Sequence, residues 1–343
     1  MSSPLNTNTT ASLSGPVDGI EIPLVMTETA EEVERVRAGA GLVDLGHVQT
    51  VRLSGPDARR FTNGMFTNNI RDLQPGECVR SAMCDDRGRV QGLLDVLCTA
   101  DDTFEGVLEG VSAEWFENRY GMYIVFDDVE LDVFDTSPWV LSLQGPATAE
   151  ILAAAGLPQP VQGHHLSTED GVRVTSKDRS GLGGVDIIAD GDSIVSVYDA
   201  LVSAGATSIG FLALEQLRIE SGRARWPVDG TEKSMVHELG INEEVCNFNK
   251  GCYLGQEVIN RVDVKGQITK KIHTIVVDTD PAMLAGAAVQ LDDKQVGTIT
   301  SATHNGQHAI ALAVIRKAAW ADGQTVQITL PSGPVEGKVQ HPT

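Results

Sequence analysis

A short strand followed by Gly-Pro and then a helix occurs twice in this chain, and this pattern limits most strongly what the chain can fold into. Residues 48–53 have the character of a strand, lead into Gly55 and proline, and precede apolar residues at helical spacing. Residues 139–143 lead into Gly145 and proline in the same way, 90 positions later. The repeat indicates a duplicated α+β element. Gly-Pro pairs that open two unrelated helices are the alternative.

The stretches between and after these two units alternate antiparallel hairpins with helices, which is typical of an α+β chain rather than of a parallel doubly wound sheet. From residue 269 the pattern changes to short strands separated by turn residues. These strands are expected at residues 271–277, 288–291, 295–303, 308–315, 325–330 and 335–339. Such a series predicts a small C-terminal β-barrel.

The predicted organisation has four parts. Residues 1–25 are expected to form a flexible tail, because the first 19 lack both the basic start and the apolar centre of a secretory signal. Residues 26–135 and 136–265 are expected to be two α+β halves of one ligand-binding region, and residues 266–343 the barrel module.

Charge and hydropathy exclude several classes of partner. The chain has 343 residues, 41% of them hydrophobic, with 26 Lys and Arg against 47 Asp and Glu, so its formal net charge is −21. This balance argues against bulk binding to nucleic acid or anionic lipid. No apolar run approaches the roughly 20 residues that a membrane-spanning helix needs.

The cysteines argue against a disulfide framework and a closed zinc site, because they are odd in number and contain no CxxC pair. They are Cys78, Cys84, Cys98, Cys246 and Cys252. The histidines show no HxxxH or HxH spacing, so no metal site is predicted. A reducing, cytoplasmic location fits this usage best.

The most unusual stretch is residues 247–261, in which glycines, Lys250 and Cys252 lead into a segment with helical spacing. A cysteine near a helix N-terminus and a lysine is favoured as thiolate, the form that is nucleophilic, redox-active or metal-ligating. Free cysteine is also one of the most often buried residues, so a small packed residue in a tight turn is the alternative.

The eight residues from Lys250 to Glu257, KGCYLGQE, resemble the K-G-C-Y-x-G-Q-E signature of YgfZ-type folate-binding proteins. These are relatives of the glycine-cleavage T-protein, an aminomethyltransferase, and are linked to iron–sulphur cluster assembly or repair. The resemblance implies a T-protein-like fold, a three-domain ring around a channel that holds tetrahydrofolate or a derivative. It makes Cys252, as the functional thiol, and Lys250 the candidate catalytic residues, with supporting roles for Gly251, Tyr253, Gly255, Gln256 and Glu257.

The resemblance also implies two folate-binding residues. Residues 184–187, Gly-Val-Asp-Ile, are similar to the family segment whose carboxylate grips the pterin, which makes Asp186 a candidate. Arg218 corresponds to a family arginine in a helix. A carboxylate can accept paired hydrogen bonds from an amino-pyrimidine edge, and an arginine can pair with a carboxylate or stack on a ring. The alternative for both is a surface charge or an internal salt bridge.

One departure from the family concerns the carboxylate pair tied to aminomethyl transfer, because the alignment places Gly92 and Leu93 at those positions. Asp95 is close in sequence, but a shift along a strand changes its depth and its face. The leading hypothesis is therefore a tetrahydrofolate-binding protein that supports iron–sulphur enzymes or assembly proteins through Cys252, with a transient cluster as one role. A folate-dependent aminomethyl or one-carbon transferase and a non-catalytic docking module are the alternatives. Whether the protein is an enzyme stays open.

Overall fold

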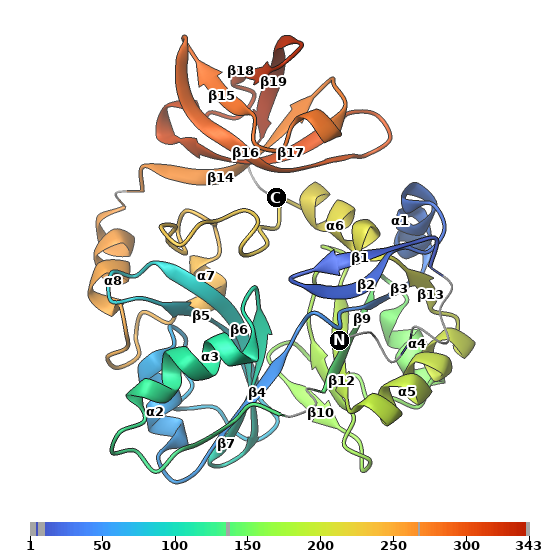
Figure 1. The fold of residues 1–343 in the computed structure, drawn as a ribbon, viewed down its shortest axis with the longest axis vertical. Coiled ribbons are helices and arrows are strands. Elements are labelled where there is room, and N and C mark those ends of the chain that lie inside the picture. Colours follow the sequence, from blue (N-terminus) through green and yellow to red (C-terminus); the bar gives the residue numbers. More distant parts are fainter. Residues whose placement is uncertain (1–4, 6–10, 135–137, 267, 341–343) are drawn as a thin grey trace. The chain divides into compact units, whose positions relative to one another are not determined.

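The computed structural model describes residues 5, 11–134, 138–266 and 268–340, whose helices and strands are labelled in Figure 1. These residues form two compact units. The first unit comprises the described residues up to Met83 together with Gly92–Glu215. The second comprises Cys84–Gln91 together with the described residues from Gln216 onward.

One sheet of the first unit, called the N-terminal sheet below, has the strand order β5-β6-β7-β4-β8. Its strands are β4 (Thr50–Ser54), β5 (Cys78–Cys84), β6 (Val90–Ala100), β7 (Thr103–Glu109) and β8 (Glu130–Asp132), and its helices are α2 (Ala58–Met65) and α3 (Ala113–Tyr120), the latter followed by the 3-10 turn η2 (Gly121–Tyr123). Phe61 of α2 and Phe116 of α3 pack with Leu94 and Val96 of β6 in one core. Both helices therefore cover the same face of this sheet.

The other large sheet of the first unit, called the central sheet, has the order β10-β11-β12-β9-β3-β13. Its strands are β3 (Gly41–Asp44), β9 (Trp139–Gln144), β10 (His165–Ser167), β11 (Arg173–Ser176), β12 (Gly184–Ala189) and β13 (Thr207–Ile209). The helices of this part of the chain are α1 (Thr29–Ala38), α4 (Thr148–Ala154) and α5 (Gly191–Ser203), and α6 (Phe211–Glu220), which follows β13, is divided between the two units. Leu152 of α4 and Leu201 of α5 share a core with Leu141 and Ile187 of the sheet.

Alternation along the strands gives each sheet a second, polar face. Leu94 and Val96 point into the core under the helices, so Asp95 between them points away from it. Asp186 alternates in the same way with Ile187, which belongs to the core of the central sheet. The polar faces of the two sheets meet within the first unit and hold the charged residues described below.

The predicted strand-Gly-Pro-helix repeat is confirmed as β4 followed by α2 and β9 followed by α4. Gly55 and Gly145 have φ of 118° and 131°, a region in which residues with a side chain are strained. A Cβ atom at either position would also lie 2.5 Å from a backbone oxygen, that of Asp128 or of Gly39. The strand of the first copy, β4, belongs to the N-terminal sheet, and that of the second, β9, belongs to the central sheet.

The second unit ends in the predicted barrel, which is closed in the order β14-β17-β16-β15-β18-β19. Its strands are β14 (Lys270–Val277), β15 (Ala288–Leu291), β16 (Lys294–His304), β17 (Ala309–Arg316), β18 (Thr325–Leu330) and β19 (Gly333–Gln340), with 3-10 turns η3 (Pro281–Met283) and η4 (Lys317–Ala319). Ile275, Ile299 and Ile328 contribute to its core. The short helices α7 (Asn242–Val245) and α8 (Gln256–Lys265) precede it.

The expectation of a flexible tail over residues 1–25 is wrong from Leu13 onward, where β1 (Leu13–Val17) and β2 (Ile20–Val25) form an antiparallel hairpin. The two-residue turn between them is Asp18-Gly19, both at positive φ, which is a strong hairpin signal. Ile22 is fully buried and anchors the hairpin. Residues 1–4 and 6–10 lie outside the described residues.

The predicted division of the chain near residue 266 falls between α8 and β14, where Gln267 lies outside the described residues. The division at residue 135 falls between β8 and β9, and residues 135–137 are likewise outside. No helix in the described part of the chain is long and apolar enough to cross a membrane.

Candidate functional site

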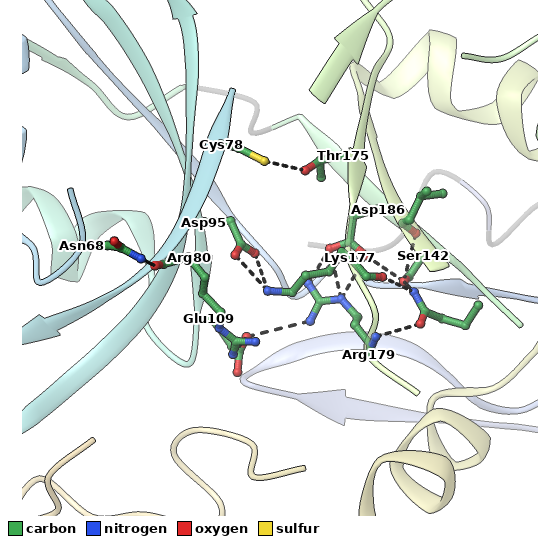
Figure 2. Close-up of polar contacts among 12 residues, drawn as sticks. Asn68, Cys78, Arg80, Asp95, Glu109, Ser142, Thr175, Lys177, Arg179 and Asp186 are labelled. Atoms are coloured by element: carbon green, nitrogen blue, oxygen red, sulfur yellow. Dashed lines mark hydrogen bonds and ion pairs between the residues drawn. The ribbon is translucent and has the colours of Figure 1, made fainter. Parts of the chain in front are cut away.

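A network of three acidic and three basic side chains occupies the polar faces of the two sheets in the first unit, and Figure 2 shows its members pointing toward one another. It consists of Arg80, Asp95, Glu109, Lys177, Arg179 and Asp186, which we call the six-charge network. The side chains are between 1% and 15% exposed. Burial of this many charges requires close pairing, because an unpaired buried charge is costly.

Lys177 bridges the two sheets by binding Asp95. Its Nζ donates to both carboxylate oxygens of Asp95, at 2.9 and 2.6 Å. Lys177 follows β11 of the central sheet, whereas Asp95 belongs to β6 of the N-terminal sheet. The sequence did not show on which face of the strand Asp95 lies. In the structure, both of its carboxylate oxygens bind Lys177.

Asp186 is fully buried and is held by Arg179. The Nε of Arg179 lies 3.0 Å from both carboxylate oxygens, and Nη2 donates to Oδ2 at 2.6 Å. Ser142 Oγ donates to Oδ1 at 2.7 Å. Each oxygen therefore accepts two hydrogen bonds, which accounts for the roughly four acceptor positions of a carboxylate.

Glu109 gives Arg179 a second acidic neighbour. Arg80 Nη2 donates to Glu109 Oε2 at 2.8 Å, and Arg179 Nη1 lies 4.0 Å from the same oxygen. Glu109 ends β7, and Arg80 belongs to β5. Arg179 therefore lies between Asp186 of one sheet and Glu109 of the other (Figure 2).

The hairpin turn that carries Lys177 and Arg179 is fixed by a side chain from β9. Gln144 Nε2 donates to the carbonyl oxygen of Lys177 at 2.8 Å and to Ser142 Oγ at 2.9 Å. Its Oε1 accepts from the backbone N–H of Arg179 at 2.8 Å. The main chain at Arg179 is thus anchored, while its side chain binds Asp186 and faces Glu109.

Pairing within the network favours the charged forms of Asp95, Glu109 and Arg179. Burial alone raises the pKa of Asp95, but the nearby Lys177 and Arg80 outweigh it, so the pKa is lowered. The pKa of Glu109 is lowered in the same way, mainly by Arg80 and Lys177 against the effect of burial. Burial lowers the pKa of Arg179, yet Asp186 and Glu109 more than offset this and the pKa is raised.

Gly92 occupies the apolar face of β6. A Cβ atom there would lie 2.6 Å from Met83 Cε and 3.0 Å from Val111 Cγ1. Leu93, on the opposite face, is buried. The two positions aligned with the transfer-step carboxylates therefore hold a glycine packed under apolar side chains and a leucine.

Arg218 belongs to the second unit, where it forms an internal ion pair. Its Nη1 donates to Asp229 Oδ2 at 2.6 Å and its Nη2 to Ser301 Oγ at 2.9 Å. Arg218 is 5% exposed and Asp229 is fully buried. Asp186 and Arg218 are thus in different units, each with an internal partner, and their folate roles stay predictions.

The signature segment, residues 250–257, precedes and begins α8 in the second unit. Among the five cysteines, all of which the structure describes, Cys252 alone is exposed. Helix α8 starts at Gln256 with Gly255 as N-cap, so Cys252 lies three residues before the cap and not in the first turn. The dipole effect is confined to the first turn, and exposure is therefore the main physical distinction of this thiol.

The neighbours of Cys252 turn inward. Lys250 is buried, and its Nζ lies 5.0 Å from the centre of the Tyr253 ring, in a cation–π contact. Tyr253 is buried as well, and burial raises its pKa. Gln256 Nε2 donates to the carbonyl oxygens of Lys250 and Gly251 at 3.5 and 3.4 Å. These two long hydrogen bonds connect the start of α8 to the main chain on the N-terminal side of Cys252.

Gly255 lets the signature pack against the hairpin at residues 85–88. Its φ is 82°, and a Cβ atom would lie 2.5 Å from the carbonyl oxygen of Asp85 and 2.9 Å from Gly88 Cα. Glu257 instead points outward and pairs with Arg261 at 2.6 Å, with both side chains exposed. Lys250, Tyr253, Gly255 and Gln256 of the signature therefore stabilise the conformation of the loop.

Comparison with known proteins identifies the architecture. The family model described as the GCVT N-terminal domain matches residues 12–250, and the glycine cleavage T-protein C-terminal barrel domain matches residues 270–343. The chain belongs to the glycine cleavage T-protein family. Because the first match alone spans more than half of the chain, the predicted T-protein fold, with mixed α/β domains and a closed C-terminal barrel, is confirmed.

Relatives of known name extend across the whole chain. An aminomethyltransferase of Thermosipho melanesiensis is 26% identical over 335 residues, which cover 94% of this chain and 90% of the relative. An aminomethyltransferase of Bacillus pumilus is 26% identical over 351 residues, covering 94% and 91%. The crystal structure of glycine cleavage system aminomethyltransferase T from Bartonella henselae superposes with a TM-score of 0.91 at 20% identity, covering 100% of this chain and 97% of that chain.

Sequence reasoning missed most of the six-charge network. A signal existed in β6, because Asp95 interrupts an otherwise apolar strand, and a charge in such a place requires a partner. The partner, Lys177, is 82 residues away, and neither spacing nor composition relates the two. In the part of the chain that the structure describes, no three His, Cys, Asp or Glu side chains gather to hold a metal ion.

Proposed function

We propose that this T-protein family member binds tetrahydrofolate and supports the assembly or repair of iron–sulphur enzymes through Cys252. The single observation that carries the proposal is the exposure of Cys252 beside the buried side chains of Lys250 and Tyr253. A loop closed by Gln256 and seated by Gly255 keeps one thiol at the surface. An exposed thiol can reach a partner protein, whereas a buried one cannot.

Chemical complementarity at Asp186 supports the folate part of the proposal. The edge of a pterin offers an amino group beside a ring N–H, two parallel donors like those of a guanidinium. Arg179 presents such a fork to Asp186. The buried carboxylate thus suits a pterin edge, with Ser142 as a neighbouring hydroxyl. In bound form, tetrahydrofolate would supply one-carbon or redox chemistry, and Asp186 and Ser142 would orient its pterin.

Packing around Gly92 argues against aminomethyl transfer. A general acid or base must lie within hydrogen-bond reach of the proton it moves. Gly92 carries no such group, and Met83 and Val111 fill the space that its side chain would need. Asp95 is paired to Lys177 through both oxygens. We therefore expect no turnover of an aminomethyl-lipoyl donor.

A second candidate function is folate-dependent aminomethyl transfer, which the names of the Thermosipho and Bacillus relatives favour. The two functions differ in one assay. An aminomethyltransferase releases ammonia from an aminomethyl-lipoyl donor in proportion to tetrahydrofolate. The proposed function predicts release no faster than the background without protein.

The test of the proposed function uses cells that lack the native gene and are supplied with variants of it. Cys252→Ser keeps the size of the side chain but removes the soft, ionisable sulphur. We expect it to bind tetrahydrofolate like the wild type yet leave iron–sulphur enzyme activity at the level of the deletion. The control is Asn249→Ser, an exposed change three residues away, which should restore activity fully. Full restoration by Cys252→Ser would refute the proposal.

A further inference from the structure

The fork of Arg179 on Asp186 has a consequence for ligand binding. All four acceptor positions of Asp186 are taken, by Arg179 on both oxygens and by Ser142 on one. Any ligand that is to use this carboxylate must first remove a donor. Arg179 supplies most of the bonds, so it is the donor that has to leave.

We propose that Arg179 is an internal competitor for the ligand edge of Asp186, and that a ligand binds there by displacing its guanidinium toward Glu109. The inference rests on the proposed folate function and adds a residue that sets the affinity and selectivity of the site. It predicts selection for ligands that present two parallel N–H donors, because only such an edge replaces what the guanidinium provides.

Glu109 is the reason that displacement is feasible. A neutral ligand edge that replaces a cation leaves the positive charge without its partner, and an unpaired buried charge is costly. Arg179 Nη1 is already 4.0 Å from Glu109 Oε2. A rotation of the side chain therefore exchanges one carboxylate for another, while the guanidinium stays inside a network of three acids and three bases.

The anchoring of the turn confines the exchange to the side chain. Gln144 holds the backbone N–H of Arg179 and the carbonyl of Lys177. Asp178 Oδ1 accepts from the backbone N–H of Gly181 at 2.7 Å. Because the main chain is held on both sides of Arg179, the Lys177–Asp95 bridge remains in place when the guanidinium moves.

The experiment is anaerobic calorimetric titration with tetrahydrofolate of the full chain and four variants. Arg179→Lys keeps the charge but loses the planar fork, so it should compete less well and bind tetrahydrofolate about 5- to 10-fold more tightly. Glu109→Gln removes the alternative partner and should weaken binding by a similar factor. Asp186→Asn should weaken binding at least 10-fold.

The control variant is Arg173→Lys. Arg173 forms another ion pair in the first unit, with Glu105 at 2.8 Å, and its side chain is 16% exposed, close to the 15% of Arg179. The affinity of the Arg173→Lys variant for tetrahydrofolate should equal that of the wild type. An arginine that merely supports the site would weaken binding when replaced, so the sign of the Arg179→Lys effect distinguishes competition from support.

The outcomes separate the inference from the function on which it rests. Weaker binding by both Asp186→Asn and Arg179→Lys would keep the folate site and overturn the role of Arg179 as competitor. Equal binding by the wild type and Asp186→Asn, or none by either, would remove Asp186 as the folate carboxylate and the competitor with it. Tighter binding by Arg179→Lys and weaker binding by Glu109→Gln support the inference.

Discussion

The six-charge network of the first unit and the signature loop of the second, residues 250–257, differ in how far their polar side chains are exposed to solvent. In the network, the ionised side chains are buried and paired, and Asp186 accepts as many hydrogen bonds as a carboxylate can. In the loop, Lys250 and Tyr253 are buried but Cys252 is exposed. In the proposed binding step, a ligand reaches Asp186 only after displacing Arg179, whereas the thiol of Cys252 is already accessible.

The buried carboxylate of Asp186 and the exposed thiol of Cys252 are therefore suited to different tasks, selective binding and reaction with a partner. A paired, buried carboxylate rejects ligands that cannot replace the donors it already has, because an unmatched buried charge is costly. An exposed thiol offers no such selection. We therefore expect mutations in the network to change stability and ligand affinity together, and mutation of Cys252 to change neither.

The largest effect is expected from breaking the pair of Asp186 and Arg179. Asp186→Ala removes the main partner of the buried Arg179 guanidinium and leaves it only the more distant Glu109, which Arg80 already binds, so it should lower the free energy of unfolding by about 3–5 kcal/mol. The double variant Asp186→Ala with Arg179→Met removes both charges and should recover most of that loss. Urea unfolding of the four proteins of this double-mutant cycle measures the coupling.

The exposed pair of Arg35 and Glu31 is the control for this cycle, because their side chains are 50% and 52% exposed. Glu31→Ala should lower the free energy of unfolding by less than about 1 kcal/mol. A loss for Asp186→Ala as small as that for Glu31→Ala would show that the network is not the buried, coupled system described above.

The next largest effect on stability is expected at Gly255 of the signature loop. Gly255→Ala places a side chain at positive φ and within 2.5 Å of the Asp85 carbonyl oxygen, so it should lower the free energy of unfolding by about 2–3 kcal/mol. Gly251→Ala is the matched control, since no atom lies within 4 Å of its Cβ position. Thermal unfolding of both variants tests this, and equal stability would contradict the packing assigned to Gly255.

A smaller effect concerns pH and the acids of the network. Asp95 and Glu109 have pKa values below those of free carboxyls, despite burial, because Lys177, Arg80 and Arg179 surround them. Their stabilising contribution is therefore complete above the usual carboxyl pKa of about 4 and is lost as the pH falls through the lower folded values.

The free energy of unfolding should accordingly decrease below about pH 5. Replacing the bridge by Asp95→Leu with Lys177→Met should reduce that slope by at most one proton, or about 1.4 kcal/mol per pH unit. Urea titrations at several pH values measure it. A slope unchanged by the double replacement would mean that Asp95 has no lowered pKa in the folded protein.

The barrel and the repeated strand-Gly-Pro-helix units could be predicted from the sequence because their signals are local. Gly55 and Gly145 mark turns that only glycine fills without strain, and the barrel strands are bounded by turn residues. The hairpin from residue 13 was missed because a proline and two glycines in it, Pro16, Gly15 and Gly19, also suit a flexible tail.

The candidate site could be predicted only in part, for a physical reason. Asp186 and Cys252 were identified because each lies in a recognisable segment. The partner of Asp186 is Arg179, seven residues away across a hairpin turn, and nothing in the spacing indicates that the guanidinium folds back onto the strand. The exposure of Cys252 is a property of the folded loop, and the spacing of the residues does not indicate it.

Differential alkylation tests most directly the central claim that Cys252 is the displayed thiol. Burial raises the pKa of Cys78 to about 11 and that of Cys84 well above the usual range, so neither should react in the native protein. The native chain is treated with iodoacetamide at pH 7, and modification of each cysteine is followed by mass spectrometry. We expect Cys252 to be modified first and the buried cysteines only after unfolding in urea. Modification of Cys252 only in the unfolded protein would contradict the account.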